Sequence, residues 1–228
     1  MRSRTPAAVL WDMDGTLIDS EPFWIAAETE LVSSFGGTWT HEDGLAMVGN
    51  PMATSAATLR AHGVDLTDEE IFAFLNSRVA AGVAAGTPWQ PGARELLVDL
   101  AARGVPMALV TSSHRELAEP FVRGAGFFQV SVCGDEVVRP KPDPEPYLTA
   151  AARLGVDIAG CLAVEDSPAG IASAVASGAR VLAVEVMVGV VPRPGVSRVR
   201  SLADVGIDDL DRIMGGEVLV PRAVATEV

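Results

Sequence analysis

The feature that most constrains the fold is a short apolar run, residues 8–11, that leads directly into two carboxylates one residue apart. Such a run is typical of a buried strand. Residues two apart on a strand share a side, so Asp12 and Asp14 can converge as the chain leaves it. Gly15 permits a close turn there, and its place as fourth residue excludes a calcium EF-hand loop. Two carboxylates this close call for a proton or a cation between them.

The next seventy residues predict a block of helices and no strand. A helix is expected from Ser20 to about residue 35, and a short one capped by Thr40. A further helix covers about 52–62, and Thr67 opens the last one with a capping box. We therefore expect residues 18–88 to form a helical cap domain that is inserted after the first strand.

From residue 89 onward the pattern alternates between helix and strand. Apolar runs predict strands at 105–110, 130–133, 161–164 and 179–184. An amphipathic segment predicts a helix at 92–103, and further helices are predicted at 114–123, 144–154, 168–177 and 207–214. Short apolar strands between helices indicate an α/β fold with a Rossmann-like parallel sheet. The predicted core comprises residues 1–17 and 89–214, and residues 215–228 are expected to form a loosely attached C-terminal tail.

Composition limits the classes of partner. A formal charge of −13 argues against nucleic acid and anionic membranes, but not against a small anionic substrate that responds to local charge. The apolar run near the start is interrupted by Asp12 and no later run reaches membrane-spanning length, so neither a signal peptide nor a membrane span is expected; Cys133 and Cys161 lie in short apolar runs. We expect a cytoplasmic protein with two buried thiols, as a monomer or small homo-oligomer.

Polar chemistry follows the predicted strands. Thr111 and Ser112 come after one strand, and Glu165 and Asp166 after another. Ligands of open parallel sheets bind beyond the carboxyl ends of the strands, so these residues are expected to meet Asp12 and Asp14 there. Lys141 is the only lysine among seventeen basic residues and stands between two prolines. A compact ammonium in such a loop suits a phosphate or carboxylate pocket.

Together and in this order, these motifs resemble those of the haloacid dehalogenase superfamily of aspartyl-nucleophile phosphotransferases. The matching stretches are Asp12-Met13-Asp14-Gly15-Thr16, Val110-Thr111-Ser112-Ser113, Lys141-Pro142 and Glu165-Asp166-Ser167-Pro168-Ala169-Gly170. The helical insert resembles the cap of the subfamily that contains β-phosphoglucomutase and small sugar-phosphate phosphatases. The resemblance extends to about residue 214.

The resemblance implies a role for each core residue. Asp12 would be the nucleophile that forms an aspartyl-phosphate, and Asp14 the general acid and then base. Thr111 would bind phosphate oxygens and Lys141 would offset negative charge. Mg²⁺ would be held by Asp12, the backbone carbonyl of Asp14 and Asp166, with Glu165 either a further ligand or a support for the others; Ser112 is a candidate substrate contact.

Substrate choice is expected to lie in the cap, where the candidate contacts are Trp24, Asn50, Met52 and Arg78. The resemblance leaves three alternatives to a phosphatase of small phosphorylated metabolites. A true dehalogenase would need neither Asp14 nor the acidic pair at 165–166. A β-phosphoglucomutase would need cap cations for a bisphosphate, whereas Trp24 and Asn50 occupy places where a histidine and an arginine are expected. A binding module without activity is the third.

Overall fold

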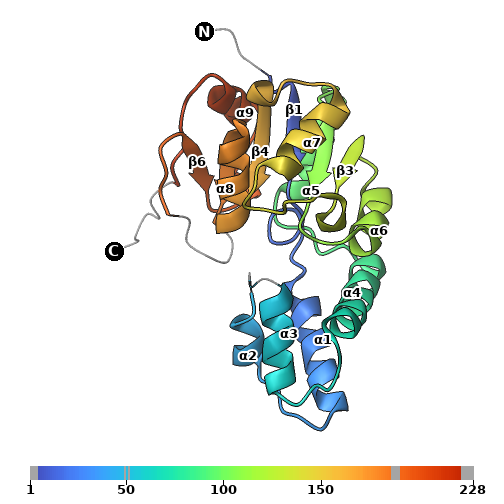
Figure 1. Cartoon of the computed structure of the whole chain (residues 1–228). Coiled ribbons are helices and arrows are strands. Elements are labelled where there is room, and N and C mark those ends of the chain that lie inside the picture. The colour runs from blue at the N-terminus through green and yellow to red at the C-terminus, as the bar shows by residue number, and fades with distance from the viewer. Residues whose placement is uncertain (1–4, 49, 51, 186–190, 222–228) are drawn as a thin grey trace. The chain divides into compact units, whose positions relative to one another are not determined.

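The computed structural model describes residues 5–48, 50, 52–185 and 191–221 of the 228 residues. The chain divides into two compact units (Figure 1). The first contains the chain up to residue 18, residues 89–115 and the chain from 125 onward, and the second contains residues 19–88 and 116–124. The first unit carries the sheet, and the second is helical.

The sheet of the first unit is parallel throughout, as the sequence predicts. Its strands lie in the order β3-β2-β1-β4-β5-β6. Their bounds are β1 Ala8–Trp11, β2 Met107–Val110, β3 Val130–Val132, β4 Cys161–Glu165, β5 Arg180–Val184 and β6 Val196–Val199. Strand β1 is central, because Val9 pairs with Met107 on one side and with Leu162 on the other. The loop after β1 is therefore flanked by the ends of β2 and β4.

Both faces of the sheet are buried. On one face, Leu10, Val110 and Ala163 belong to a core cluster that includes residues of α7 (Glu145–Leu154) and α8 (Pro168–Ser177). On the other face, Trp11 and Val164 are also fully buried. Burial on both sides explains why these strands are continuous apolar runs rather than alternating ones.

Strand β6 is absent from the sequence-based prediction, which ended the sheet at β5. Its four residues Val-Ser-Arg-Val resemble an exposed loop, and prolines precede them at 192 and 194. In the structure Ser197 is fully buried, and its hydroxyl accepts a hydrogen bond of 3.1 Å from the Leu219 amide. Because this partner lies 22 residues away, the short local pattern could not reveal the strand.

The contact between Ser197 and Leu219 also attaches the C-terminal segment to the sheet. The amide of Arg198 donates a 2.9 Å hydrogen bond to the carbonyl of Leu219, so Leu219 is bonded to β6 in both directions. A loose attachment was expected for 215–228; at Leu219 this expectation is wrong. Residues 222–228 lie outside the described part of the chain.

The second unit is built from helices, and its described residues include no strand. Their bounds are α1 Glu21–Ser34, α2 His41–Leu45, α3 Met52–Ala61 and α4 Asp68–Ala85. Helix α4 packs against α1 and α3. The capping box predicted at Thr67 is present: Glu70 donates its amide to the Thr67 hydroxyl, and its carboxylate accepts from the Thr67 amide.

The remaining helices are α5 Ala93–Ala102, α6 Arg115–Ala125 and α9 Ile207–Met214. Cys133 and Cys161 are buried free thiols, as expected. Burial raises the pKa of Cys133 to about 12 and that of Cys161 to about 11. None of the helices in the described residues has the length and apolar content that a bilayer crossing requires.

The capping box gives a prediction for stability. Thr67→Ala removes the acceptor for the Glu70 amide and should lower the free energy of unfolding by about 1 kcal/mol. Thr58→Ala is the matched control, because the Thr58 hydroxyl bonds only to the Thr54 carbonyl inside α3. Urea denaturation followed by circular dichroism measures both. Equal midpoints for the two variants would contradict the capping role.

Candidate active site

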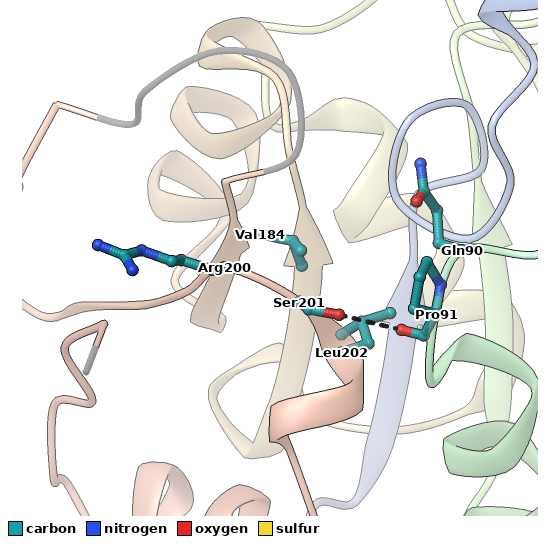
Figure 2. Close-up of a pocket in the computed structure, with 6 residues that line it drawn as sticks. All are labelled: Gln90, Pro91, Val184, Arg200, Ser201 and Leu202. Atoms are coloured by element: carbon teal, nitrogen blue, oxygen red, sulfur yellow. Dashed lines mark hydrogen bonds between the residues drawn. The ribbon is translucent and has the colours of Figure 1, made fainter. Parts of the chain in front are cut away.

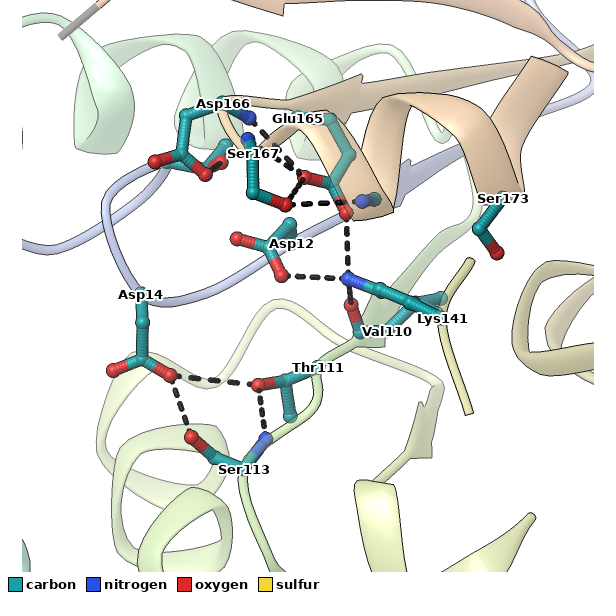
Figure 3. Close-up of polar contacts among 12 residues, drawn as sticks. Asp12, Asp14, Val110, Thr111, Ser113, Lys141, Glu165, Asp166, Ser167 and Ser173 are labelled. Carbon is teal, nitrogen blue, oxygen red and sulfur yellow. Dashed lines mark hydrogen bonds and ion pairs between the residues drawn. The ribbon is translucent and has the colours of Figure 1, made fainter. Parts of the chain in front are cut away.

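The predicted core residues meet at the carboxyl edge of the sheet (Figure 3). Asp12 follows β1, Thr111 follows β2, and Glu165 is the last residue of β4. Because β1 lies between β2 and β4, these three positions are adjacent. The loop after β3 brings Lys141 to the same place. The structure thus joins four motifs that are separated by up to about 150 residues.

Lys141 is the centre of this cluster. Its ammonium donates to Asp12 Oδ1 at 2.7 Å, to Glu165 Oε1 at 2.6 Å and to the Val110 carbonyl at 2.9 Å. An ammonium has three N–H donors, so all three are used. The side chain is only 4% exposed. Burial lowers the pKa of Lys141, but Asp12 and Glu165 outweigh it and hold this pKa above its ordinary value.

Glu165 is fully buried and accepts hydrogen bonds on both oxygens. Besides Lys141, Oε1 accepts from the Tyr147 hydroxyl at 2.8 Å. Oε2 accepts from the amide of Asp166 at 3.2 Å, and from the amide and hydroxyl of Ser167 at 3.3 and 3.1 Å. A Cβ at Gly170 would overlap this carboxylate, so the first turn of α8 fits around it only with glycine. Glu165 therefore fixes the lysine and the loop after β4 together.

Asp166 lies against the loop after β1. Its Oδ1 accepts a 3.0 Å hydrogen bond from the Thr16 hydroxyl. Gly15 has a φ of 84°, and a Cβ there would overlap the Asp166 carboxylate, so both backbone angle and space require glycine. Burial, followed by the charge of Glu165, raises the pKa of Asp166 to about 7. The same two causes raise the pKa of Asp12 well above its ordinary value, although Lys141 lowers it.

Asp14 turns toward the loop after β2. Its Oδ2 accepts a 2.6 Å hydrogen bond from the Ser113 hydroxyl and lies 3.5 Å from the Thr111 hydroxyl. The Thr111 hydroxyl in turn accepts from the Ser113 amide at 3.0 Å. Ser112, the predicted substrate contact, is exposed on the same loop. The two aspartates after β1 thus have different partners, a lysine for Asp12 and hydroxyls for Asp14.

Three carboxylates form a group suited to a metal ion. Asp12, Glu165 and Asp166 each offer an oxygen, and these atoms lie within 4.8 Å of one another. Oxygen ligands of this kind fit Mg²⁺, which binds through one or two carboxylates and retains waters. Burial and, after it, the charge of Glu165 raise the pKa values of Asp12 and Asp166 in spite of Lys141, and a cation between these carboxylates would favour their charged forms. The donor set therefore fits the predicted cofactor.

The predicted cap contacts lie in the second unit, where Asn50 and Arg78 bond to residues of the same unit. Asn50 donates its side-chain amide to the Ala46 carbonyl at 3.0 Å, and Arg78 binds Glu30. Trp24 is half-buried on α1. Met52 begins α3, but its side chain lies outside the described part, as do Gly49 and Pro51. Contact of these residues with a substrate stays a prediction.

Two site residues were missed by the analysis of the sequence. Ser113 belongs to the predicted Thr-Ser-Ser motif, but nothing in the sequence distinguishes it from Ser112. For Tyr147 the sequence predicts only that it lies in the helix at 144–154. It is the single tyrosine of the chain and is fully buried, with its ring centroid 5.3 Å from the Lys141 nitrogen. A buried phenol needs a hydrogen-bond partner, which was the available signal.

Known proteins share both the sequence and the fold. The family described as haloacid dehalogenase-like hydrolase matches residues 9–184. Validoxylamine A 7'-phosphate phosphatase of Streptomyces hygroscopicus subsp. limoneus is 35% identical over 74% of this chain and 81% of its own. Hexitol phosphatase A of Escherichia coli (strain K12) is 34% identical over 77% of this chain and 81% of its own.

A solved structure with a related sequence has the same fold. A mutant of CbbY from Rhodobacter sphaeroides, in complex with xylulose-(1,5)bisphosphate, superposes with a TM-score of 0.76 at 25% identity. The match covers 88% of this chain and 96% of that one. The family match spans well over half of the sequence and includes Asp12, Thr111 and Glu165. The chain belongs to the haloacid dehalogenase-like hydrolase family.

Proposed function

We propose that this protein is a Mg²⁺-dependent phosphatase that hydrolyses a small phosphomonoester, such as a sugar phosphate, through an aspartyl-phosphate intermediate. The relatives named above are phosphatases of small phosphorylated compounds, which supports the reaction class. A cytoplasmic location and a monomer or small homo-oligomer stay predictions from the sequence.

The observation that carries this proposal is the different environment of the two aspartates. Asp12 faces a buried ammonium and lies beside two further carboxylates, whereas Asp14 is bonded to hydroxyl groups. A nucleophile needs a fixed direction and neighbouring positive charge to receive a dianion. An acid and base needs a position from which it can exchange a proton. The two environments match these two tasks.

In the proposed reaction, a carboxylate oxygen of Asp12 attacks phosphorus and the ester P–O bond breaks. Asp14 gives its proton to the leaving oxygen, which departs as an alcohol. Asp14 then takes a proton from water as that water attacks phosphorus, releasing inorganic phosphate and restoring Asp12. Lys141 keeps Asp12 in place throughout, and Thr111 and Ser113 hold Asp14 at the opposite side of the loop.

Asp12, Asp166 and the Asp14 carbonyl would hold Mg²⁺, which neutralises charge on phosphoryl oxygens and carboxylates when bound. The sequence left two roles open for Glu165. Five hydrogen bonds on its two oxygens favour the supporting role, in which Glu165 positions Lys141 and the backbone of Asp166.

The alternatives have less support. A mutase or bisphosphatase, suggested by the bisphosphate in the CbbY complex, needs a cation for a second phosphate. The two arginines of residues 19–88 are each paired with a carboxylate of the same segment. Asp14 and the residues at 165–166 are unnecessary for a dehalogenase. A module without activity would bind phosphomonoesters but turn none over.

The direct test is phosphate release from a panel of sugar, nucleotide and small-acid phosphates. We expect release with Mg²⁺, none after exhaustive chelation, and a loss of roughly 10⁴-fold or more in kcat for Asp12→Asn. Asp99→Asn, an exposed carboxylate on α5, is the matched control and should retain full activity. Full activity in the presence of chelator would refute the mechanism, and binding without turnover would favour the inactive module.

A second prediction separates neighbouring serines. Ser113→Ala removes the 2.6 Å hydrogen bond to Asp14 and should lower kcat about tenfold with little change in KM, because the acid and base loses its anchor. Ser112→Ala, at the exposed predicted substrate contact, should instead raise KM. Steady-state kinetics on the best panel substrate measures both. A change mainly in KM for Ser113→Ala, and mainly in kcat for Ser112→Ala, would contradict these roles of the two serines.

A third prediction concerns the support of Glu165. Tyr147→Phe deletes a buried hydrogen bond to a carboxylate while keeping the ring beside Lys141. We expect a loss of about 1.5–3 kcal/mol in the free energy of unfolding, together with a lower kcat. Thermal and chemical denaturation provide the first value and phosphate release the second. A variant as stable and as active as the parent would rule out a contribution of the hydroxyl.

A further inference from the structure

Gln90 is a buried polar side chain of the first unit that the proposed reaction does not use. Its side-chain amide donates a 3.3 Å hydrogen bond to the carbonyl of Gly15, in the loop after β1. Its backbone amide donates to the Leu17 carbonyl of the same loop at 2.8 Å. Gln90 is therefore attached both by its backbone and by its side chain to the loop that carries Asp14, and all of these residues belong to one compact unit.

The carbonyl of Gly15 depends on this side chain. Backbone groups inside the loop bond to one another: the Gly15 amide donates to the Ile18 carbonyl at 2.8 Å, and the Leu17 amide donates to the Met13 carbonyl at 2.9 Å. Among the residues that the structure describes, Gln90 supplies the hydrogen bond that the Gly15 carbonyl accepts. Gly15 is buried, and a buried carbonyl that lacks a donor costs free energy. Gln90 thus meets a requirement that the loop itself leaves open.

The Gly15 carbonyl lies between two groups of the candidate site. On one side of it, Asp14 accepts a 2.6 Å hydrogen bond from Ser113. On the other side, the Thr16 hydroxyl donates to Asp166 at 3.0 Å. Gly15 has no side chain and a φ of 84°, so the peptide that joins it to Thr16 rotates more easily than one between bulkier residues. A donor on the Gly15 carbonyl opposes this rotation, because a rotated oxygen would lose its partner.

A cavity of about 200 Å³ borders Gln90 (Figure 2). Val184 and Leu202 are among the other residues that line this cavity. In Figure 2 the Gln90 side chain extends toward the loop after β1. Because packing is incomplete where the cavity lies, the hydrogen bond to Gly15 is what directs the side-chain amide toward the loop. The cavity and its apolar lining also leave room for another side chain of similar size at this position.

We propose that Gln90 is a positioning residue of the phosphatase. Through the Gly15 carbonyl it fixes the backbone between Asp14 and Thr16, and Thr16 in turn orients the Asp166 carboxylate. The inference rests on the proposed function and adds to it a residue from outside its motifs. The group that bonds to Gly15 is the amide nitrogen, since a carbonyl oxygen accepts and does not donate. The role therefore requires an N–H donor at this position and not bulk alone.

Two variants remove the donor in different ways. Gln90→Leu removes it without adding charge, and Gln90→Glu keeps the shape but has only acceptor oxygens when ionised. Gln129→Leu is the matched control, because Gln129 donates its side-chain amide to the Phe127 carbonyl at 3.2 Å and accepts from the Met107 amide at 2.7 Å. These bonds lie at the amino ends of β2 and β3, at the edge of the sheet opposite the site. A purely structural loss should therefore appear in the control as well.

Three measurements are made on each protein: steady-state hydrolysis of p-nitrophenyl phosphate, calorimetric titration with Mg²⁺, and urea denaturation. We expect both Gln90 variants to lose about tenfold to a hundredfold in kcat with little change in KM, because the displaced groups are the acid and base and a metal ligand. Their dissociation constant for Mg²⁺ should rise about tenfold, as Asp166 loses its orientation. Gln129→Leu should be less stable than the parent but equal to it in kcat and in Mg²⁺ affinity.

A kcat and an Mg²⁺ affinity equal to those of the parent in Gln90→Leu overturn the inference, whatever its stability. Equal losses of kcat in Gln90→Leu and Gln129→Leu overturn it too, since the bond would then be only structural. If one Gln90 variant does not fold, the other decides. If the parent hydrolyses no phosphomonoester, weaker Mg²⁺ binding by the Gln90 variants alone overturns only the proposed function, and unchanged Mg²⁺ binding overturns both. A parent that neither hydrolyses a phosphomonoester nor binds Mg²⁺ also overturns both.

Discussion

The site depends on one buried ammonium. Lys141 joins the ends of β1, β2 and β4 through Asp12, Val110 and Glu165, so a single side chain connects three strands at the point where they open into loops. Two carboxylates this deeply buried would be strongly unfavourable alone, and removing one partner of a buried pair costs about 3–5 kcal/mol. Arginine is a poor substitute, since a planar guanidinium does not match three acceptors arranged around one point.

That ammonium in turn requires a particular surrounding. Glu165 stays in place because Tyr147 and the loop after β4 donate to it, and because Gly170 leaves it room. Gly15 does the same for Asp166 on the other side. These glycines are thus consequences of side-chain placement and not of turns alone. A substitution at either position would act on the carboxylates first and on the backbone second.

How much could be predicted follows from the range of each interaction. Short apolar runs were enough to predict strands β1 to β5. The polar residues after these strands were enough to predict that Asp12, Lys141 and Asp166 lie close together, because parallel strands place their carboxyl ends at one edge of the sheet. Strand β6 was not predicted because its buried serine, Ser197, receives its hydrogen bond from Leu219, which is distant in the sequence. The roles of Tyr147 and Ser113 were not predicted because their hydrogen-bond partners, Glu165 and Asp14, lie 18 and 99 residues away in the sequence. Contact of Trp24, Asn50, Met52 and Arg78 with a substrate stays a prediction.

A phosphatase with a net negative charge needs local positive charge at its site, because its dianionic substrate is repelled by the protein as a whole. Field from the net charge of −13 opposes the approach of a phosphate and is screened beyond about 8–10 Å at moderate ionic strength. Inside that distance the positive charge of Lys141, whose N–H groups are bonded to Asp12, Glu165 and Val110, and the donor groups of the loops would act on the phosphate of the proposed substrate. In the proposed reaction, binding of the substrate would therefore depend on contacts at the sheet edge rather than on long-range attraction, and the encounter with the substrate would be slower. Anions that lack a group complementary to this edge would be repelled by the net charge without any compensating contact. Repulsion would thus contribute to selectivity.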